Sequence, residues 1–278
     1  MFLLKVSCIT GLVQYEYICY DKIPDVKITL LGTGTSQGVP VIACSCPVCQ
    51  SEDPRDRRLR SSILIEKEGK ILVIDTGPDF RQQMLTQDVK DLTAILFTHE
   101  HKDHVAGLDD VRAFNFILKR HMDVYAEKRV QEALKREYAY IFSDEKYPGV
   151  PRINMHLIQN REFNIGEISV LPIRAYHYRL PVFGFRIDNF AYLTDVKSVP
   201  DEELYKLKNL EILVLTALRK QTHISHMNLD EAVNLINRVK PVKTYLTHLS
   251  HAFGLHREEE AKLPPHIRIA YDGLSISL

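Results

Sequence analysis

The sequence predicts an α/β protein in which two sheets and their outer helices form a layered sandwich. Short apolar runs with strand propensity occur in both halves of the chain, and segments with helical spacing lie between them. Polar residues of metal-ligand type directly follow several of these runs, as expected where strand ends from both halves meet at one edge of a sandwich. The 278 residues, 45% of them hydrophobic, suffice for one large domain with a buried core.

The first 25 residues are expected to be an N-terminal extension, and residues 26–278 to form the domain. Within the extension, residues 15–20 have strand propensity but no obvious partner strand. They are interpreted as an added edge strand or a loosely held tail, without a catalytic role, because chain termini tolerate such additions.

The first half of the domain is expected to be rich in strands. Gly, Asp or charged residues end each of the strands predicted at 28–31, 62–66, 71–74 and 94–98. Helices are predicted at 78–85 and 127–141. In the longer helix, apolar residues recur at three- and four-residue steps, which gives one apolar stripe and one charged face.

The second half of the domain repeats this pattern. Strands are predicted at 168–173, 182–187, 191–194, 212–216 and 243–247, and helices at 200–208 and 228–239. Strands of both halves with helices outside them indicate two packed sheets.

The charge balance and the cysteine count narrow the class of protein. Basic and acidic side chains number 36 each, so nothing in the net charge favours a large nucleic-acid footprint or a membrane surface, and a small substrate fits better. No apolar run approaches the roughly 18 residues that span a bilayer, and no secretory signal is evident. Five cysteines, an odd number, argue against a disulfide framework and for a reducing, cytoplasmic setting.

A dense group of metal-ligand side chains follows the predicted strand at 94–98. His99, His101, Asp103 and His104 lie within six residues. Neutral imidazoles and carboxylates suit zinc, manganese or iron. Side chains one or two positions apart on a turning loop cannot all face one point, so the group holds one ion or is divided between two. Either arrangement needs further ligands from elsewhere.

Three later residues have the same placement at the end of an apolar run. His177 follows the strand predicted at 168–173, Asp195 follows 191–194 and His248 follows 243–247. The recurrence makes these residues the candidates for the missing ligands.

A second candidate metal site lies in a cysteine-rich loop. Cys44, Cys46 and Cys49 supply three thiolates, one ligand short of a closed tetrahedral zinc site. His251, three residues after His248, is the candidate for the fourth ligand of this structural zinc.

This set of residues resembles the metallo-β-lactamase superfamily, in which the same His-x-His-x-Asp-His run, later His, Asp and final His occur in this order. The resemblance covers essentially Val26 to the C-terminus and implies a four-layer αββα sandwich. It also implies two catalytic divalent metal ions, manganese or zinc, bridged by a shared aspartate. On this chain, one ion would be held by His99, His101 and His177, the other by Asp103, His104 and His248, and both by Asp195.

The cysteine loop and the run 31–40 narrow the resemblance to the phosphodiesterases of the phosphonate carbon–phosphorus lyase pathway, which open 5-phosphoribosyl 1,2-cyclic phosphate. Members of that group carry a structural zinc beside the two-metal site, and the resemblance suggests a homodimer. A leaving alkoxide needs a proton from a positioned acid. The resemblance implies His226 for this role, with His223 as the second candidate.

Two other functions stay open. The first is RNA cleavage of the ribonuclease Z type, which shares the two-metal chemistry but uses an inserted arm rich in Gly and basic residues, and no such insertion occurs here. The second is a zinc-stabilised binding protein without turnover, which the complete ligand set argues against. The physiological substrate is open in either case.

Overall fold

Strict alternation of apolar residues along the strands divides the core among three interfaces. In the computed structural model, which describes residues 4–9, 12–17, 26–145 and 147–278, neighbours along one strand point to different clusters. In β5 (Lys70–Ile74), Leu72 and Ile74 face the second sheet, whereas Val73 faces helices. In β12 (Phe190–Leu193), Tyr192 faces the first sheet and Leu193 faces the opposite helices. Three apolar interfaces separate four layers, so the predicted αββα sandwich is confirmed.

Each of the two sheets has seven strands. The first runs in the order β16 (Ser275–Ser277), β3 (Lys27–Gly32), β4 (Ser62–Lys67), β5, β6 (Ala94–Leu96), β7 (Met122–Ala126), β8 (Ile153–Leu157). The second runs in the order β9 (Phe163–Ile165), β10 (Ile168–His177), β11 (Leu180–Ile187), β12, β13 (Ile212–Thr216), β14 (Lys243–Thr247), β15 (Ile267–Ile269).

The two sheets share one pairing pattern. In the orders given above, the first three pairs of each sheet are antiparallel and the last three are parallel. In this pattern β5 corresponds to β12, and β6 to β13. The carboxyl ends of the parallel strands of each sheet lie together at one edge.

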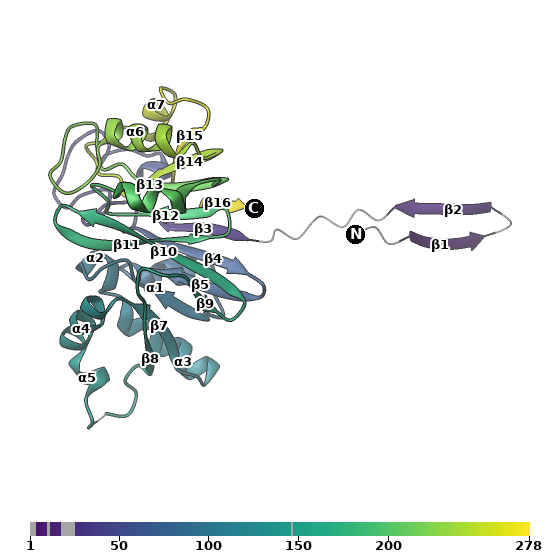
Figure 1. The fold of residues 1–278 in the computed structure, drawn as a ribbon, viewed down its shortest axis with the longest axis horizontal. Coiled ribbons are helices and arrows are strands. Elements are labelled where there is room, and N and C mark those ends of the chain that lie inside the picture. Colours follow the sequence, from purple (N-terminus) through teal and green to yellow (C-terminus); the bar gives the residue numbers. More distant parts are fainter. Residues whose placement is uncertain (1–3, 10–11, 18–25, 146) are drawn as a thin grey trace.

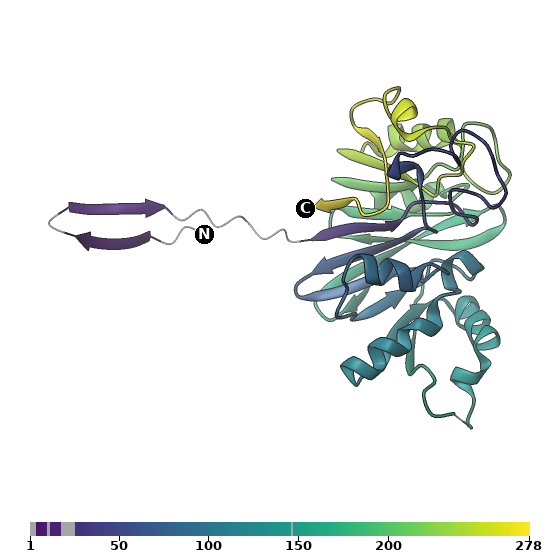
Figure 2. The same cartoon turned by 180° about the vertical axis from the view of Figure 1, so that it is seen from behind.

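Helices cover the outer faces of both sheets (Figures 1 and 2). On one side lie α6 (Leu229–Val239) and α7 (His256–Glu260), with the 3-10 helix η3 (Asp201–Leu207) contributing to the same apolar cluster. On the other lie α1 (Phe80–Thr86), α3 (Arg112–Leu118), α4 (Lys128–Glu137) and α5 (Ala139–Phe142). Three short helices complete the fold, namely η1 (Pro54–Asp56), α2 (Lys102–Val105) and η2 (Leu108–Val111).

Three expected elements differ in the structure. The single helix expected at 127–141 is broken at Tyr138, whose hydroxyl donates to the Val105 carbonyl 2.7 Å away, and it becomes α4 and α5. The segment 201–207 forms a 3-10 helix where an α-helix was expected. The strand expected without a partner in residues 15–20 is part of β2 (Leu12–Tyr17), which pairs with β1 (Leu4–Ile9) in a separate two-stranded sheet, while residues 18–20 lie outside the described ones.

Within the described part of the chain, no helix combines the length and the apolar character that crossing a bilayer requires.

Candidate metal centre

The predicted ligands come together at the edge where the parallel strands of both sheets end. His99 to His104 follow β6 and lead into α2, and His177 is the last residue of β10. Asp195 lies two residues after β12, and His248 directly follows β14. The topology therefore brings side chains from both halves of the chain to one place.

Left-handed backbone at three strand ends turns the chain sharply beside the cluster. Asp75, Asp195 and His248 have φ values of +66°, +55° and +58°. Such values are uncommon outside Gly, Asn and Asp, and they persist only where the surroundings hold them. Asp75 directly follows β5 and Asp195 lies two residues after β12, so the two aspartates lie beyond the ends of corresponding strands. Residue types alone gave no indication of this turn.

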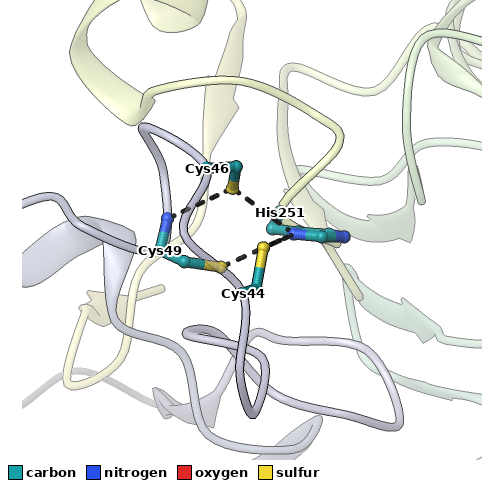
Figure 3. A group of neighbouring side chains, drawn as sticks. All are labelled: Cys44, Cys46, Cys49 and His251. Carbon is teal, nitrogen blue, oxygen red and sulfur yellow. Dashed lines mark hydrogen bonds between the residues drawn. The ribbon is translucent and has the colours of Figure 1, made fainter.

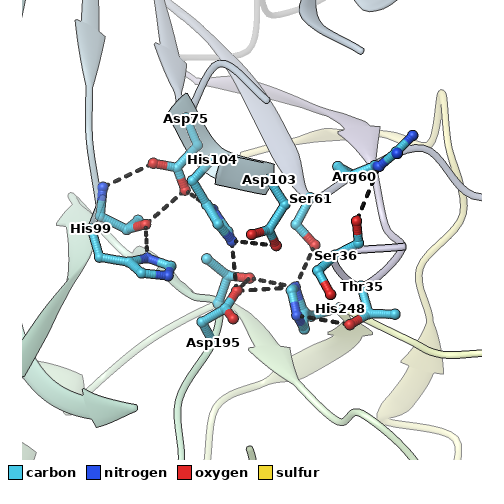
Figure 4. Close-up of polar contacts among 12 residues, drawn as sticks. Thr35, Ser36, Arg60, Ser61, Asp75, His99, Asp103, His104, Asp195 and His248 are labelled. Atoms are coloured by element: carbon cyan, nitrogen blue, oxygen red, sulfur yellow. Dashed lines mark hydrogen bonds and ion pairs between the residues drawn. The ribbon is translucent and has the colours of Figure 1, made fainter. Parts of the chain in front are cut away.

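The first group of ligand atoms comes from Asp103, His104, Asp195 and His248, and these atoms all lie within 4.8 Å of one another (Figure 4). Nε2 of His104 is 2.8 Å from Oδ2 of Asp195 and 3.1 Å from Oδ2 of Asp103. Nδ1 of His248 is 3.0 Å from the same Asp195 oxygen. Side chains of His104 and His248 are fully buried.

The second group shares Asp195 with the first. Ligand atoms of His177, Asp195 and His226 also lie within 4.8 Å of one another. The ring of His101 is 5.1 Å from that of His177 and 4.6 Å from that of His99. The structure thus brings together all seven residues expected to hold the two catalytic metals, and it adds His226 at ligand distance from Asp195 and His177.

Unpaired imidazole nitrogens test whether a metal fits this cluster. Nε2 of His99, Nδ1 of His177 and Nδ1 of His226 are buried without a hydrogen-bond partner, and Nε2 of His104 faces the carboxylates of Asp103 and Asp195. The other ring nitrogens of His99 and His104 lie 3.0 Å from Thr98 Oγ1 and 2.7 Å from Asp75 Oδ2. Buried polar atoms without a partner are unfavourable, and neutral imidazole with carboxylate is a good donor set for divalent transition metals. The residues present therefore fit metal ions.

The electrostatics of the cluster agree with this fit at four imidazoles. His104 is the exception, because Asp103, Asp195 and Asp75 outweigh the effect of burial and raise its pKa well above the usual range. Burial lowers the pKa of His99, of His101 and of His248, and lowers that of His226 to about 3, so these imidazoles are neutral. Burial opposes ionisation of Asp195, but His248 and His104 outweigh it and hold the pKa of this carboxyl well below its usual range. Ionised carboxylate and neutral imidazole are the forms that bind a metal.

Asp75 supports the ligand loop from behind. Its fully buried carboxylate accepts hydrogen bonds of 2.8 Å from both the amide and the hydroxyl of Thr98 and lies 2.7 Å from Nδ1 of His104. A carboxylate on the far nitrogen of a ligand histidine fixes the ring and its tautomer. Close approach of the Asp75 loop requires Gly77, because a Cβ there would lie 2.1 Å from the Asp103 carbonyl oxygen.

Arg129 on α4 links two ligand-bearing segments. Its guanidinium forms an ion pair with Glu100, which lies between His99 and His101, and donates to the Pro181 carbonyl 2.5 Å away in β11, beyond His177. The sequence did not predict this contact, because an arginine on a helix is equally compatible with a solvent-exposed position.

The three cysteines of the loop and His251 point toward one another (Figure 3). Sγ atoms of Cys44, Cys46 and Cys49 lie 3.2, 3.4 and 3.5 Å from Nδ1 of His251. Tetrahedral zinc with ordinary Zn–S and Zn–N bonds would place sulfur and nitrogen about 3.5 Å apart. The backbone N–H of Cys49 lowers the pKa of the Cys46 thiol to about 6. The geometry therefore suits a closed zinc site.

His223 stands apart from both metal-ligand groups. Its ring centroid lies 5.0 Å from that of His226, and its Nδ1 accepts a hydrogen bond of 3.3 Å from the Ser225 amide. His223 is partly exposed, so it is placed at the rim of the cluster rather than inside it.

Comparisons with known proteins agree with the fold. A family model described as "Beta-lactamase superfamily domain" matches residues 70–249, which include every predicted catalytic ligand but neither the cysteine loop nor His251. The crystal structure of a protein described as a new diphosphatase from the PhnP family is 39% identical, with a TM-score of 0.86, and the match covers 91% of this chain and 97% of that one.

Two curated relatives carry different names. An octanoyltransferase of Porphyromonas gingivalis is 41% identical over 252 residues, which make up 90% of this chain and 51% of that protein. A ribonuclease Z of Nostoc punctiforme is 24% identical over 167 residues, which make up 58% of this chain and 46% of that protein. The chain thus spans about half the length of these two relatives.

Replacing Cys46 with Ser is expected to lower bound zinc by one equivalent and to lower the melting temperature, because a structural zinc contributes directly to folding. The metal content of the main cluster should not change. Metal analysis and calorimetry on the same preparation measure both effects. Loss of all bound metal, or unchanged zinc, would contradict the assignment of the loop.

Replacing Asp75 with Ala should weaken metal binding at the main cluster by about 10- to 100-fold, because the His104 ring loses its orienting carboxylate. Competition with a chelator of known affinity measures the change. Asp79→Ala is the matched control, since Asp79 pairs with Arg60 outside the cluster. Equal affinities in the Asp75 variant and the wild type would rule out an orienting role.

Proposed function

The chain belongs to the beta-lactamase superfamily, and we propose that it is a two-metal phosphodiesterase that hydrolyses a small cyclic phosphodiester such as 5-phosphoribosyl 1,2-cyclic phosphate. One observation carries the proposal. Asp195 lies within ligand distance of two separate groups of metal-binding side chains, so one carboxylate can hold two ions next to each other. Paired divalent ions are typical of enzymes that cleave phosphate esters.

We propose the division of the ligands between two ions that the family resemblance implies. We assign His99, His101 and His177 to one ion, Asp103, His104 and His248 to the other, and Asp195 to both. When bound, the two ions would supply Lewis acidity that activates water and offsets the charge of the phosphoryl oxygens. The buried side chains around them exclude bulk water, which strengthens every charge interaction in the site.

His226 is proposed to protonate the leaving alkoxide, with His223 as the second candidate. His226 is nearly buried and close to Asp195, with 3.6 Å between its Nδ1 and Oδ1 of the carboxylate. The burial that lowers its pKa to about 3 opposes protonation, whereas an anionic phosphate beside the ring would favour it. The same position suits a metal ligand, so the two roles require an experiment that separates them.

Two alternatives have support of their own. The protein of the 39% identical structure is described as a diphosphatase, which favours cleavage of a diphosphate bond at the same centre. Similarity to ribonuclease Z favours an RNA phosphodiester, although the balanced charge of this chain does not suit a large nucleic-acid footprint. Assays with the cyclic sugar phosphate, a nucleoside diphosphate sugar and a precursor transfer RNA decide among the three.

The proposal also includes the cellular compartment of the enzyme and the metals that it binds. Cys44, Cys46 and Cys49 are free thiols arranged for chelation, which suits a reducing cytoplasm and a structural zinc. Manganese or zinc suits the main cluster, because imidazole and carboxylate accept both ions. We propose a homodimer only because the family resemblance implies one.

Replacing Asp195 with Ala is expected to abolish turnover of the cyclic phosphodiester while the protein stays folded, because both ions lose a shared ligand. Initial rates measure the loss of turnover, and circular dichroism shows whether the protein stays folded. Dialysis against a chelator should have the same effect, with activity restored by manganese or zinc. Activity that survives chelation would contradict a metal-dependent reaction.

Replacing His226 with Gln should lower kcat on the cyclic sugar phosphate by roughly 100-fold or more, since the alkoxide then leaves without its acid. On bis(p-nitrophenyl) phosphate, whose leaving group departs readily as an anion, the loss should be only a few-fold. Equal losses on both substrates, together with reduced metal content, would instead identify His226 as a metal ligand.

A further inference from the structure

A two-residue hairpin tip beside the cluster has an unusual backbone. His177 and Leu180 are paired across β10 and β11, so the connection consists of Tyr178 and Arg179 alone. Tyr178, the first of the two, has a φ of +56°. Tight hairpin turns normally use Gly, Asn or Asp where φ is positive, and a bulky residue there is an outlier that points to a function.

The base of this hairpin is firmly held. The Tyr176 amide donates to the Ser198 carbonyl at 2.9 Å, and the Lys197 amide donates to the Tyr176 carbonyl at 2.7 Å. Arg129 donates to the Pro181 carbonyl on the other strand. The tip therefore has a fixed position, whereas the side chains of Tyr178 (48% exposed) and Arg179 extend into solvent.

The tip lies at the rim of the metal centre. His177 directly precedes Tyr178, and its ring is 4.5 Å from that of His226. Lys197 connects the hairpin to the loop of His223, because its Nζ donates to the His223 carbonyl at 2.8 Å while its amide bonds to Tyr176. That loop adds an apolar surface at Ile224, which is 67% exposed.

Arg179 is an available cation at this rim. The neighbouring Arg129 and Arg174 form ion pairs with Glu100 and Glu127. Among the described residues no carboxylate forms an ion pair with Arg179, whose guanidinium instead lies 5.2 Å from the centre of the Tyr178 ring. An arginine packed on an aromatic ring is pre-positioned, and its planar fork matches a phosphate group.

We propose that the Tyr178–Arg179 tip is the substrate-recognition element of the enzyme. Arg179 binds a second phosphate, a monoester carried on the same sugar as the scissile diester, and Tyr178 packs against the sugar ring between the two phosphates. This inference rests on the proposed phosphodiesterase function and goes beyond it by assigning the residues that recognise the second phosphate and the sugar of the proposed substrate.

Steady-state kinetics of Arg179→Ala on two substrates test the proposal. The KM for 5-phosphoribosyl 1,2-cyclic phosphate should rise about tenfold or more, the size of a lost charge-assisted hydrogen bond. The kcat/KM for bis(p-nitrophenyl) phosphate, which lacks a second phosphate, should stay within about twofold. Arg136→Ala, an exposed arginine on α4, is the matched control and should change neither value. An unchanged KM, or an equal loss on both substrates, would overturn the proposal.

Ribose 5-phosphate separates this inference from the proposed function. As a competitive inhibitor of bis(p-nitrophenyl) phosphate hydrolysis, it should bind the wild type about tenfold more tightly than Arg179→Ala. That result supports the phosphate site even if the cyclic sugar phosphate is not turned over, a failure that would count against the proposed substrate alone. Equal inhibition of both proteins would overturn the inference while diester hydrolysis persists.

Replacing Tyr178 with Gly separates recognition from structure. Glycine relieves the left-handed backbone, so the melting temperature should stay unchanged or rise. The KM for the sugar phosphate should nevertheless rise several-fold, because the ring surface is lost. An unchanged KM would contradict a role for Tyr178 in recognition.

Discussion

The carboxylate of Asp195 is the group on which the rest of the site depends. It is buried, lies 2.8 Å from His104 and 3.0 Å from His248, and belongs to both groups of ligand atoms. A buried carboxylate is costly unless cations compensate it. The fold places this group where strands of both sheets end, so the stability of the sandwich and the position of the ligands are set by the same packing.

The two sheets share one strand-pairing pattern, and an aspartate follows the corresponding strand in each. The two aspartates differ in role because their neighbours differ. Asp75 and Asp195 follow corresponding strands with the same left-handed turn. Thr98 and His104 surround Asp75, so its carboxylate oxygens form hydrogen bonds to protein groups and are not free to bind a metal ion. Asp195 instead lies within ligand distance of His177 and His226, whose Nδ1 atoms are buried without a hydrogen-bond partner. The cysteine loop reaches the same region through His251, only three residues after His248.

Much of the fold and the site could be predicted from the sequence, because apolar alternation and ligand-type residues at strand ends are local signals. The strands at 212–216 and 243–247 have the predicted bounds. Short, partly exposed strands such as β8 and β9 have too weak an apolar alternation to be predicted. The helix break at Tyr138 coincides with a hydrogen bond to Val105, which is distant in the sequence. Likewise the turn at Tyr178, the Arg129 link and the approach of His226 to Asp195 depend on tertiary contacts.

The central claim is that one carboxylate joins two metal ions between the halves of the chain. Anomalous diffraction from crystals of the manganese-loaded protein tests it directly. We expect two peaks about 3.5 to 4 Å apart, one on either side of the Asp195 carboxylate, and a separate zinc peak among Cys44, Cys46, Cys49 and His251. A single peak at the main cluster under saturating metal, or two peaks that Asp195 does not contact, would contradict it.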